Sequence, residues 1–163
     1  MDGKLRNMTS VDLTGEQGIL CLYRIGSRVA NNLYVGSAGG HFEQGELNDA
    51  RACALREMRE ELGLTEADVA DLKLSYITLR LKIGEIRQNY YFFGKLIRDR
   101  KLESTEGNLH WFTYEEAEFL HMPASAKHMM LHYLKVGRFD EHLYAGITDE
   151  AGTKFVIMKD FED

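Results

Sequence analysis

The sequence contains little that would mark a secreted, membrane or metal-finger protein. Its two cysteines, Cys21 and Cys53, have neither disulfide nor metal-ligand spacing, so we expect two buried thiols. No apolar run approaches the roughly 20 residues of a membrane span, and the polar N-terminus is not typical of a signal peptide. These absences predict a cytoplasmic protein without a membrane partner.

Positive charge is also in deficit. The chain has 20 Lys and Arg residues against 26 Asp and Glu residues, which gives a formal net charge of −6 at pH 7. Binding of a nucleic acid polymer needs a clustered basic face that displaces counterions, so that class of partner is disfavoured. A small phosphate ester remains a suitable ligand, because metal ions can mediate its contact with carboxylates.

The order of patterns along the chain predicts one domain over residues 1–163, with a single proline and no repeat or flexible linker. Apolar and alternating patterns predict strands over residues 7–14, 18–25, 73–83, 87–97 and 109–114, and a final hairpin with its turn at 149–152. Helices are predicted over residues 48–62 and 124–136, and short helical turns after Thr65 and Thr113. Strands outnumber helices, so the expected fold is an α/β (α+β) sandwich with a mixed sheet.

The predicted helix over residues 48–62 carries three glutamates at i, i+3 and i+4. At about 100° per residue, Glu57, Glu60 and Glu61 share one arc of the helix, away from its apolar stripe. Like charges at this spacing destabilise a helix, and a bound cation would turn their repulsion into coordination. Carboxylate oxygens suit Mg²⁺ or Mn²⁺. Taken alone, the trio is more typical of a solvated acidic face than of a metal site.

The residues around the trio add a second signal. The stretch 40–64 resembles the signature of the Nudix hydrolase family, G-x5-E-x7-R-E-U-x-E-E-x-G-U, where U is aliphatic. Gly40 and Glu46 have the family spacing, and residues 56–64 match without a gap. The spacer from Glu46 to Arg56 holds nine residues instead of seven. We expect the extra two in the loop before the helix, because an insertion within the helix would rotate the glutamates by about 200°.

The resemblance implies a fold, a reaction and a set of site residues. The fold is the family's α/β/α sandwich with a mixed sheet, and the reaction is attack of water on a nucleoside diphosphate linked to another moiety. Mg²⁺ or Mn²⁺ would be the cofactor, held by Glu57, Glu60, Glu61 and the backbone of Gly40. Glu57, as the preferred base, would form the catalytic set with Glu60 and Arg56, and Arg56 would orient a glutamate.

The substrate is expected to be a small nucleotide, bound by a monomer or a homodimer. The C-terminal half resembles the MutT-like branch that converts oxidised purine nucleoside triphosphates such as 8-oxo-dGTP to the monophosphate and pyrophosphate. That branch places two aspartates shortly after a proline, whereas Pro123 is followed by Ala124 and Ser125. The alternatives are ADP-ribose, a dinucleoside polyphosphate, coenzyme A or a nucleotide sugar as substrate, and a non-catalytic nucleotide-sensing module.

Four residues outside the signature are candidates for substrate binding. Arg24 and Arg87 are candidate phosphate-binding cations, with ordinary surface charge as the alternative. His41 adjoins the expected phosphate loop. Trp111 could stack on a purine or belong to the core. Within the loop, Glu46 is open between an outer metal ligand and a solvated charge.

Overall fold

The computed structural model describes residues 3–26, 31–98 and 101–159. Its strands are β1 (Lys4–Gly15), β2 (Gly18–Arg24), β3 (Leu33–Val35), β4 (Ala38–His41), β5 (Val69–Lys82), β6 (Glu85–Leu96), β7 (Gly107–Phe112), β8 (Tyr144–Asp149) and β9 (Gly152–Ile157). Its helices are α1 (Ala50–Leu62), α2 (Tyr114–Ala117) and α3 (Ala124–Lys135). Single 3₁₀ turns lie at Gln44–Glu46, Glu66–Asp68 and Gly137–Phe139. The predicted helices and strands are therefore confirmed, with ends that differ by a few residues.

All nine strands belong to one sheet. Its order is β3-β2-β1-β6-β5-β8-β9, with β4 paired to β1 and β7 paired to β2. The β1–β6 and β5–β8 pairs are parallel, and the other pairs are antiparallel. The sheet is thus mixed, as predicted.

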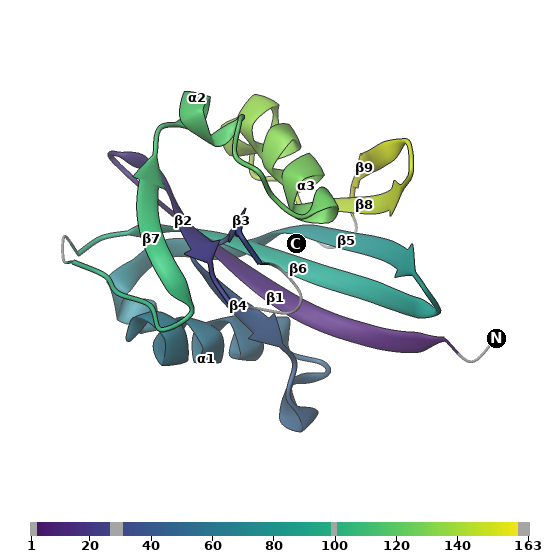
Figure 1. Ribbon diagram of the computed structural model, residues 1–163, viewed down its shortest axis with the longest axis horizontal. Coiled ribbons are helices and arrows are strands. Elements are labelled where there is room, and N and C mark those ends of the chain that lie inside the picture. The colour runs from purple at the N-terminus through teal and green to yellow at the C-terminus, as the bar shows by residue number, and fades with distance from the viewer. Residues whose placement is uncertain (1–2, 27–30, 99–100, 160–163) are drawn as a thin grey trace.

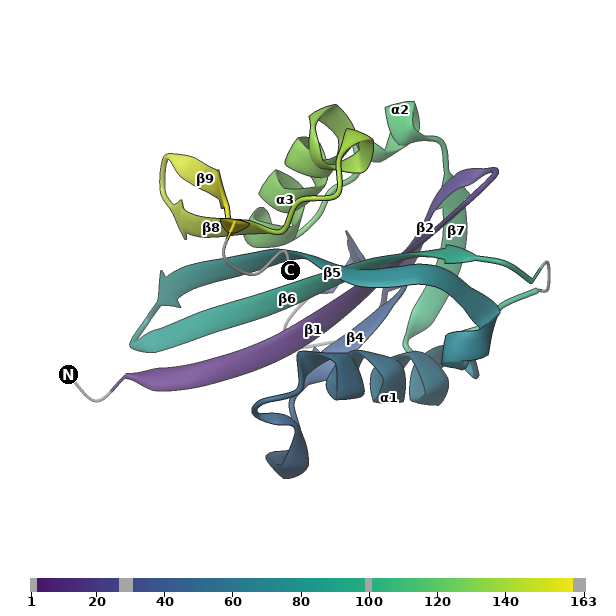
Figure 2. The same cartoon turned by 180° about the vertical axis from the view of Figure 1, so that it is seen from behind.

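Helices cover both faces of this sheet. Figures 1 and 2 show α1 on one side and α2 with α3 on the other. One buried cluster joins the sheet to α3 through Met129, Met130 and Tyr133, and another joins it to α1 through Ala54 and Met58. The expected α/β/α sandwich is confirmed.

The aromatic run of β6 fills both buried layers. Tyr91 and Phe93 belong to the cluster under α3, whereas Phe92 belongs to the cluster over α1. Successive side chains of a strand point to opposite faces, and β6 lies between β1 and β5 in the sheet. A central strand buried on both faces explains a run of residues without polar alternation.

Helix α1 has defined ends that fix the orientation of its glutamates. Its N-terminus is capped by Asp49, whose carboxylate accepts a hydrogen bond of 2.9 Å from the Ala52 N–H. Its C-terminus is closed by Gly63 in the left-handed conformation, with φ of 66°. The helix is unbroken between these caps, so the longer spacer leaves the glutamates on one arc.

The glycine-rich segment before α1 differs from the expectation of a plain connection. Residues 38–41 form strand β4, which pairs antiparallel with β1 and sets Gly40 opposite Thr9. Glycine has low strand propensity, so local pattern could not predict this strand. The first part of the expected connection, residues 27–30, lies outside the described residues. Within the described part of the chain, no helix is long and apolar enough to cross a membrane.

Candidate active site

Arg56 is the centre of a cluster of carboxylates on α1 and its preceding loop. Its Nε donates to Glu46 at 2.6 Å, and its Nη1 donates to Glu57 at 2.7 Å and to Glu60 at 3.1 Å. Its Nη2 donates to the backbone carbonyl of His41 at 3.1 Å. The Arg56 side chain is only 14% exposed. Charge-assisted bonds in such a setting hold both partners in fixed positions.

Glu46 is the buried partner of this arginine. Its hydrogen bonds with Arg56 lower the pKa of Glu46 to about 2, and the same bonds raise the pKa of Arg56. Glu46 is 9% exposed and forms an ion pair with Arg56, so it is not a solvated charge. Its carboxylate positions Arg56, which in turn contacts Glu57.

Glu57 is packed directly on the glycine pair of β4. A Cβ atom added at Gly40 would lie 2.6 Å from the carboxyl carbon of Glu57, far inside van der Waals contact. Only glycine allows the strand to approach the carboxylate this closely. Arg56 on one side and Gly40 on the other thus fix the Glu57 side chain.

Glu61 lies on the same side of α1 and contacts the neighbouring glycine. Its Oε2 accepts a hydrogen bond of 3.2 Å from the Gly39 N–H. Burial raises the pKa of Glu61 to about 7, and the charges of Glu57 and Glu106 act in the same direction. These carboxylates therefore repel one another, which is the situation that a cation would relieve.

Glu60 completes the trio and is its most exposed member, at 55%. Among the described residues, no three His, Cys, Asp or Glu side chains converge closely enough to hold a metal ion, because Arg56 engages Glu57 and Glu60 while Gly39 engages Glu61. The donor set nevertheless fits a hard divalent cation, since it offers carboxylate oxygens from one helix face. The exposed Glu60 side chain has room to rotate toward its two neighbours.

A cavity of about 310 Å³ opens beside these glutamates, between the sheet and the start of α3. Glu61 and Gly39 line one part of it. Two predicted phosphate-binding residues, Arg24 and Arg87, also line it. The volume is at the lower end of the range for small-molecule sites, and the lining brings a carboxylate and several cations into one space.

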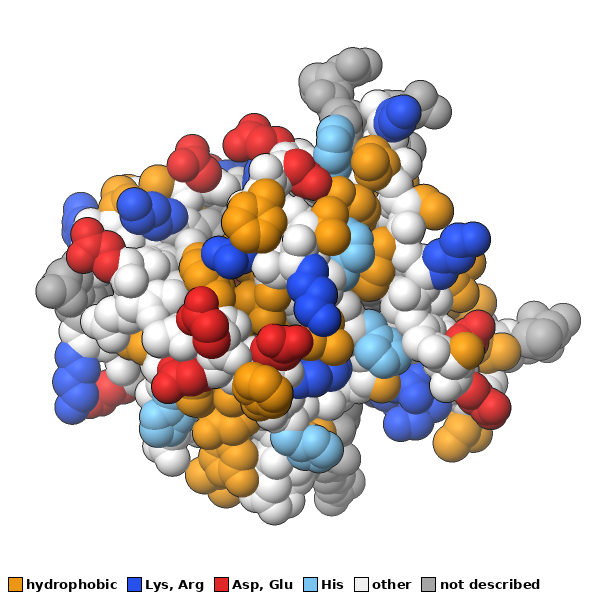
Figure 3. Space-filling model, turned by 90° about the horizontal axis from the view of Figure 1, so that it is seen from above, with side chains coloured by type: hydrophobic (Ala, Val, Ile, Leu, Met, Phe, Trp, Pro, Cys, Tyr) orange, Lys and Arg blue, Asp and Glu red, His pale blue; other side chains and the backbone are white. Residues whose placement is uncertain are grey.

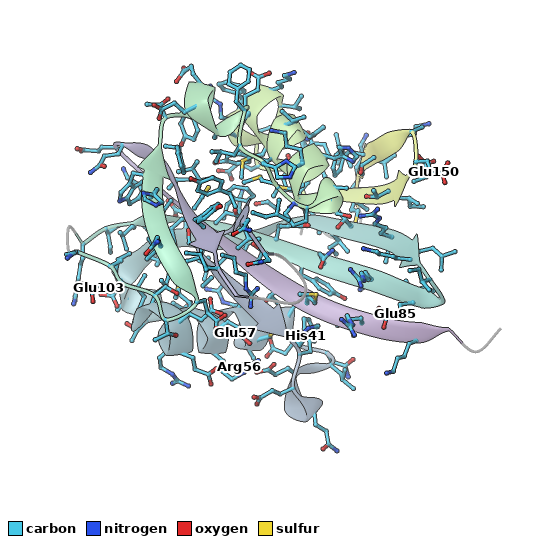
Figure 4. The ribbon with its side chains drawn as sticks, in the orientation of Figure 1. His41, Arg56, Glu57, Glu85, Glu103 and Glu150 are labelled. Carbon is cyan, nitrogen blue, oxygen red and sulfur yellow. The ribbon has the colours of Figure 1, made fainter. Side chains whose placement is uncertain are left out.

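Each predicted arginine has an acidic neighbour. Arg24 forms an ion pair of 3.1 Å with Glu106, and Arg87 lies 3.5 Å from Glu85. Figure 4 shows Arg56, Glu57 and His41 close together near α1 and β4, and Glu85 further out at the start of β6. The site therefore extends along the sheet, away from the helical glutamates.

Two predicted substrate-binding residues are placed differently. Trp111 is not among the residues that line the cavity. It packs in the core cluster over α1, and its ring lies under Gly15, where an added Cβ would meet it at 3.0 Å. The predicted stacking role is therefore corrected to a core role, because alternation along β7 turns the indole to the other face of the sheet.

His41 is exposed at the end of β4 and does not line the cavity. Partial desolvation and the positive charge of Arg6, with smaller effects of Arg24 and Arg87, lower its pKa. Its ring thus lies within the electrostatic reach of both the arginines and Glu57, at the edge of the site. Its backbone carbonyl has a definite structural part, as an acceptor for Arg56.

Several residues in and around the cavity were missed by sequence reasoning. Glu106 follows no motif and is found only because β7 pairs with β2 beside Arg24. Arg80 and Lys82 of β5 line the cavity itself, whereas Glu106 contacts the lining residue Arg24. The sequence shows that Arg80 and Lys82 share a face, since they occupy alternate positions of β5. It does not show which residues of β6 lie beside them, because that depends on the register of the two strands.

Comparison with known proteins identifies relatives of this fold. The model of the NUDIX domain family matches residues 4–133. Comparison with curated proteins gives no match. Among solved structures, a MutT protein from Bacillus halodurans is 23% identical, with a TM-score of 0.64 over 94% of this chain and 98% of that one.

Two further solved structures resemble the chain. A C. elegans Ap4A hydrolase, solved as a binary complex, is 15% identical with a TM-score of 0.65, over 78% of this chain and 94% of that one. The E. coli dihydroneopterin triphosphate pyrophosphohydrolase is 18% identical with a TM-score of 0.62, over 79% and 94%. At these identities the likeness is one of fold.

Proposed function

Because the chain belongs to the NUDIX domain family, and is therefore a hydrolase of nucleotide derivatives, we propose that it cleaves a nucleoside triphosphate to the monophosphate and pyrophosphate. Oxidised purine triphosphates such as 8-oxo-dGTP are the first class of substrate to test. The observation that carries the proposal is the position of Glu61, which belongs to the glutamate face of α1 and also lines the cavity with Arg24 and Arg87. A phosphate chain bound there would meet carboxylates on one side and arginines on the other.

We propose that Glu57, Glu60 and Glu61 hold the divalent ion, Mg²⁺ or Mn²⁺, on the side of α1 that faces β4. When bound, the ion neutralises phosphate charge and lowers the pKa of a water molecule. The backbone of Gly40 leaves the space in which the Glu57 carboxylate sits. Arg56 keeps the glutamates apart and oriented through its hydrogen bonds.

Glu57 is the side chain to which we assign removal of the proton from the attacking water. It is the most firmly held of the three glutamates, between Arg56 and Gly40. A base must stand at a fixed position relative to the water that it deprotonates. On the other side of the cavity Arg24, held by Glu106, is placed to bind a non-bridging phosphate oxygen.

The test is a substrate panel with identification of the products. Nucleoside triphosphates, oxidised ones included, are compared with ADP-ribose, dinucleoside polyphosphates and nucleotide sugars in the presence of Mg²⁺ or Mn²⁺. Monophosphate and pyrophosphate formed from a triphosphate, and only with the divalent ion, support the proposal. Turnover of ADP-ribose or dinucleoside polyphosphates alone would contradict it, and nucleotide binding without turnover of any compound would indicate a sensing module.

A further inference from the structure

Basic side chains form two neighbouring rows across the sheet, on the face that lines the cavity. In the inner row, Arg87 of β6 is the register partner of both Arg6 and Arg80. In the outer row, Glu85 is the partner of Lys4 and Lys82. Register partners point to the same face of a sheet. We call the five basic residues Lys4, Arg6, Arg80, Lys82 and Arg87 the basic rows.

The basic rows carry more positive charge than their surroundings neutralise. Glu85 lies within the outer row and pairs with Arg6 at 3.3 Å and with Arg87 at 3.5 Å. Among the described residues, neither Arg80 nor Lys82 has an acidic partner. The Nε of Arg87 is buried without a hydrogen-bond acceptor. A chain with net charge −6 therefore leaves two cations uncompensated beside its cavity.

The surplus of positive charge is confined to the surroundings of the basic rows. On the side of the molecule that carries α2 and α3, acidic and basic side chains are interspersed (Figure 3). Arg80, Lys82 and Arg87 line the same cavity as Glu61 and Gly39. The cavity of about 310 Å³ admits a small molecule, so a polymer is not the ligand that this arrangement favours.

The backbone of the basic rows is displaced along the sheet from the strand positions that the glutamates contact. Gly39 is the register partner of Ser10, and Ser10 is the partner of Tyr91. Arg87 lies four residues before Tyr91 on β6, which corresponds to roughly 13 Å along a strand. This displacement favours a phosphate group further along the substrate as the ligand of the basic rows, because the two phosphorus atoms of the scissile pyrophosphate are joined through a single oxygen.

We propose that the basic rows are a second phosphate subsite, which binds a phosphate group of the substrate that is remote from the scissile linkage. The inference rests on the proposed function for the place of that linkage, at the glutamates of α1. Phosphate is the chemical class that fits, because guanidinium groups bind it through paired N–H donors and Lys82 adds a mobile point charge. A neutral nucleobase or sugar would leave Arg80 and Lys82 unpaired.

The subsite is tested first by direct binding, without catalysis. Inorganic tripolyphosphate is titrated calorimetrically into the metal-free protein in the presence of a chelator, so that the glutamates do not contribute. The variant carrying both Arg80→Gln and Lys82→Gln is expected to bind about tenfold more weakly, since each change removes a charge-assisted contact. Lys154→Gln is the matched control. Lys154 is exposed, and its side chain lies on the face of the sheet opposite to the face that carries Arg80.

Equal binding by the double variant and the wild type, or an equal loss in the Lys154→Gln control, would overturn the proposal. The second measurement compares kcat/KM for guanosine 5′-triphosphate and for its 3′-diphosphate derivative with Mg²⁺. The derivative is expected to be preferred at least about tenfold by the wild type, and the double variant is expected to lose that preference. An unchanged preference in the double variant would contradict the subsite. Absence of turnover with both compounds and with every triphosphate of the substrate panel would contradict the proposed function, whereas the binding measurement would still decide on the subsite.

Discussion

The two charged regions of this site are built in opposite ways. Around Arg56, one largely buried guanidinium is shared by four carboxylates, those of Glu43, Glu46, Glu57 and Glu60. In the basic rows, by contrast, Arg80 and Lys82 have no acidic partner among the described residues. Paired charges of the first kind fix side chains in place, and unpaired charges of the second kind keep their attraction for a ligand. The comparison separates residues that position the chemistry from residues that select the substrate.

The largest expected effect comes from removing the shared guanidinium. Arg56→Ala leaves Glu46 buried without its partner, so the free energy of unfolding should fall by about 3–5 kcal/mol. Urea denaturation measures the change. The counterpart in the basic rows is Arg80→Gln, which is expected to alter stability by no more than about 0.5 kcal/mol. A similar loss in both variants would remove the distinction between the two regions.

The next test concerns a buried carboxyl that has no basic partner in the part of the chain that the structure describes. Asp12 is 1% exposed, and burial raises its pKa to about 7 despite a hydrogen bond from Ser10. The folded state therefore holds the proton more tightly than the unfolded state. The stability contributed by this group is complete below about pH 4 and is lost as the pH rises through 7.

Asp12→Asn should remove that pH dependence, since the amide does not titrate and can still accept the Ser10 hydrogen bond. Relative to the wild type, the variant should gain stability of the order of 3 kcal/mol at pH 8. The two proteins should differ far less at pH 4. Urea denaturation at both pH values measures the difference, and a gain of equal size at both would contradict titration of the Asp12 carboxyl as its cause.

The close approach at β4 predicts a smaller effect that is confined to activity. Gly40→Ala forces the Glu57 carboxylate to move, because the added Cβ has no space beside it. Displacement by about 1 Å can lower turnover about 100-fold. Gly45→Ala is the control, since nothing lies within 4 Å of an added Cβ there. Equal rates for the two variants would show that Glu57 does not need its present position.

The smallest predicted effect concerns salt. Unpaired cations attract a polyanionic substrate more strongly at low ionic strength, so KM should rise with added salt. In the variant with Arg80→Gln and Lys82→Gln, KM should rise severalfold less between low and physiological ionic strength. Steady-state rates over a salt series provide the measurement. If KM depends on salt identically in both proteins, the basic rows make no electrostatic contribution to substrate binding.

Much of the fold could be predicted because its signals are local. The period of 3.6 residues and the caps at Asp49 and Gly63 mark α1, and turn residues mark the hairpins. Strand β4 could not be predicted, because its pairing with β1 depends on backbone contacts and not on side-chain pattern. The same limit applies to Trp111, whose face of the sheet follows from the pairing of β7 with β2.

The site was most predictable where its residues are close together in sequence. The signature brings Glu57, Glu60 and Glu61 together on one helix, and local geometry is enough to group them. Arg80 and Glu106 come from different parts of the chain, and only the sheet register brings Arg80 to the cavity and Glu106 to Arg24. The ion pair of Glu46 with Arg56 likewise crosses the loop that holds the two additional spacer residues.

The most direct test of the metal-dependent reaction is a Mg²⁺ titration of turnover for the wild type and for Glu60→Gln. The Glu60 side chain is 55% exposed, and among the described residues its one ion-pair partner is Arg56. Thermal unfolding of the variant should therefore match that of the wild type. Mutation of a residue that only supports a metal ligand lowers metal affinity or activity about 10–100-fold. Loss of a ligand itself should therefore lower kcat at saturating Mg²⁺ at least about 100-fold. A folded Glu60→Gln protein with the wild-type rate and Mg²⁺ dependence would contradict the assignment of the α1 glutamates as the metal site.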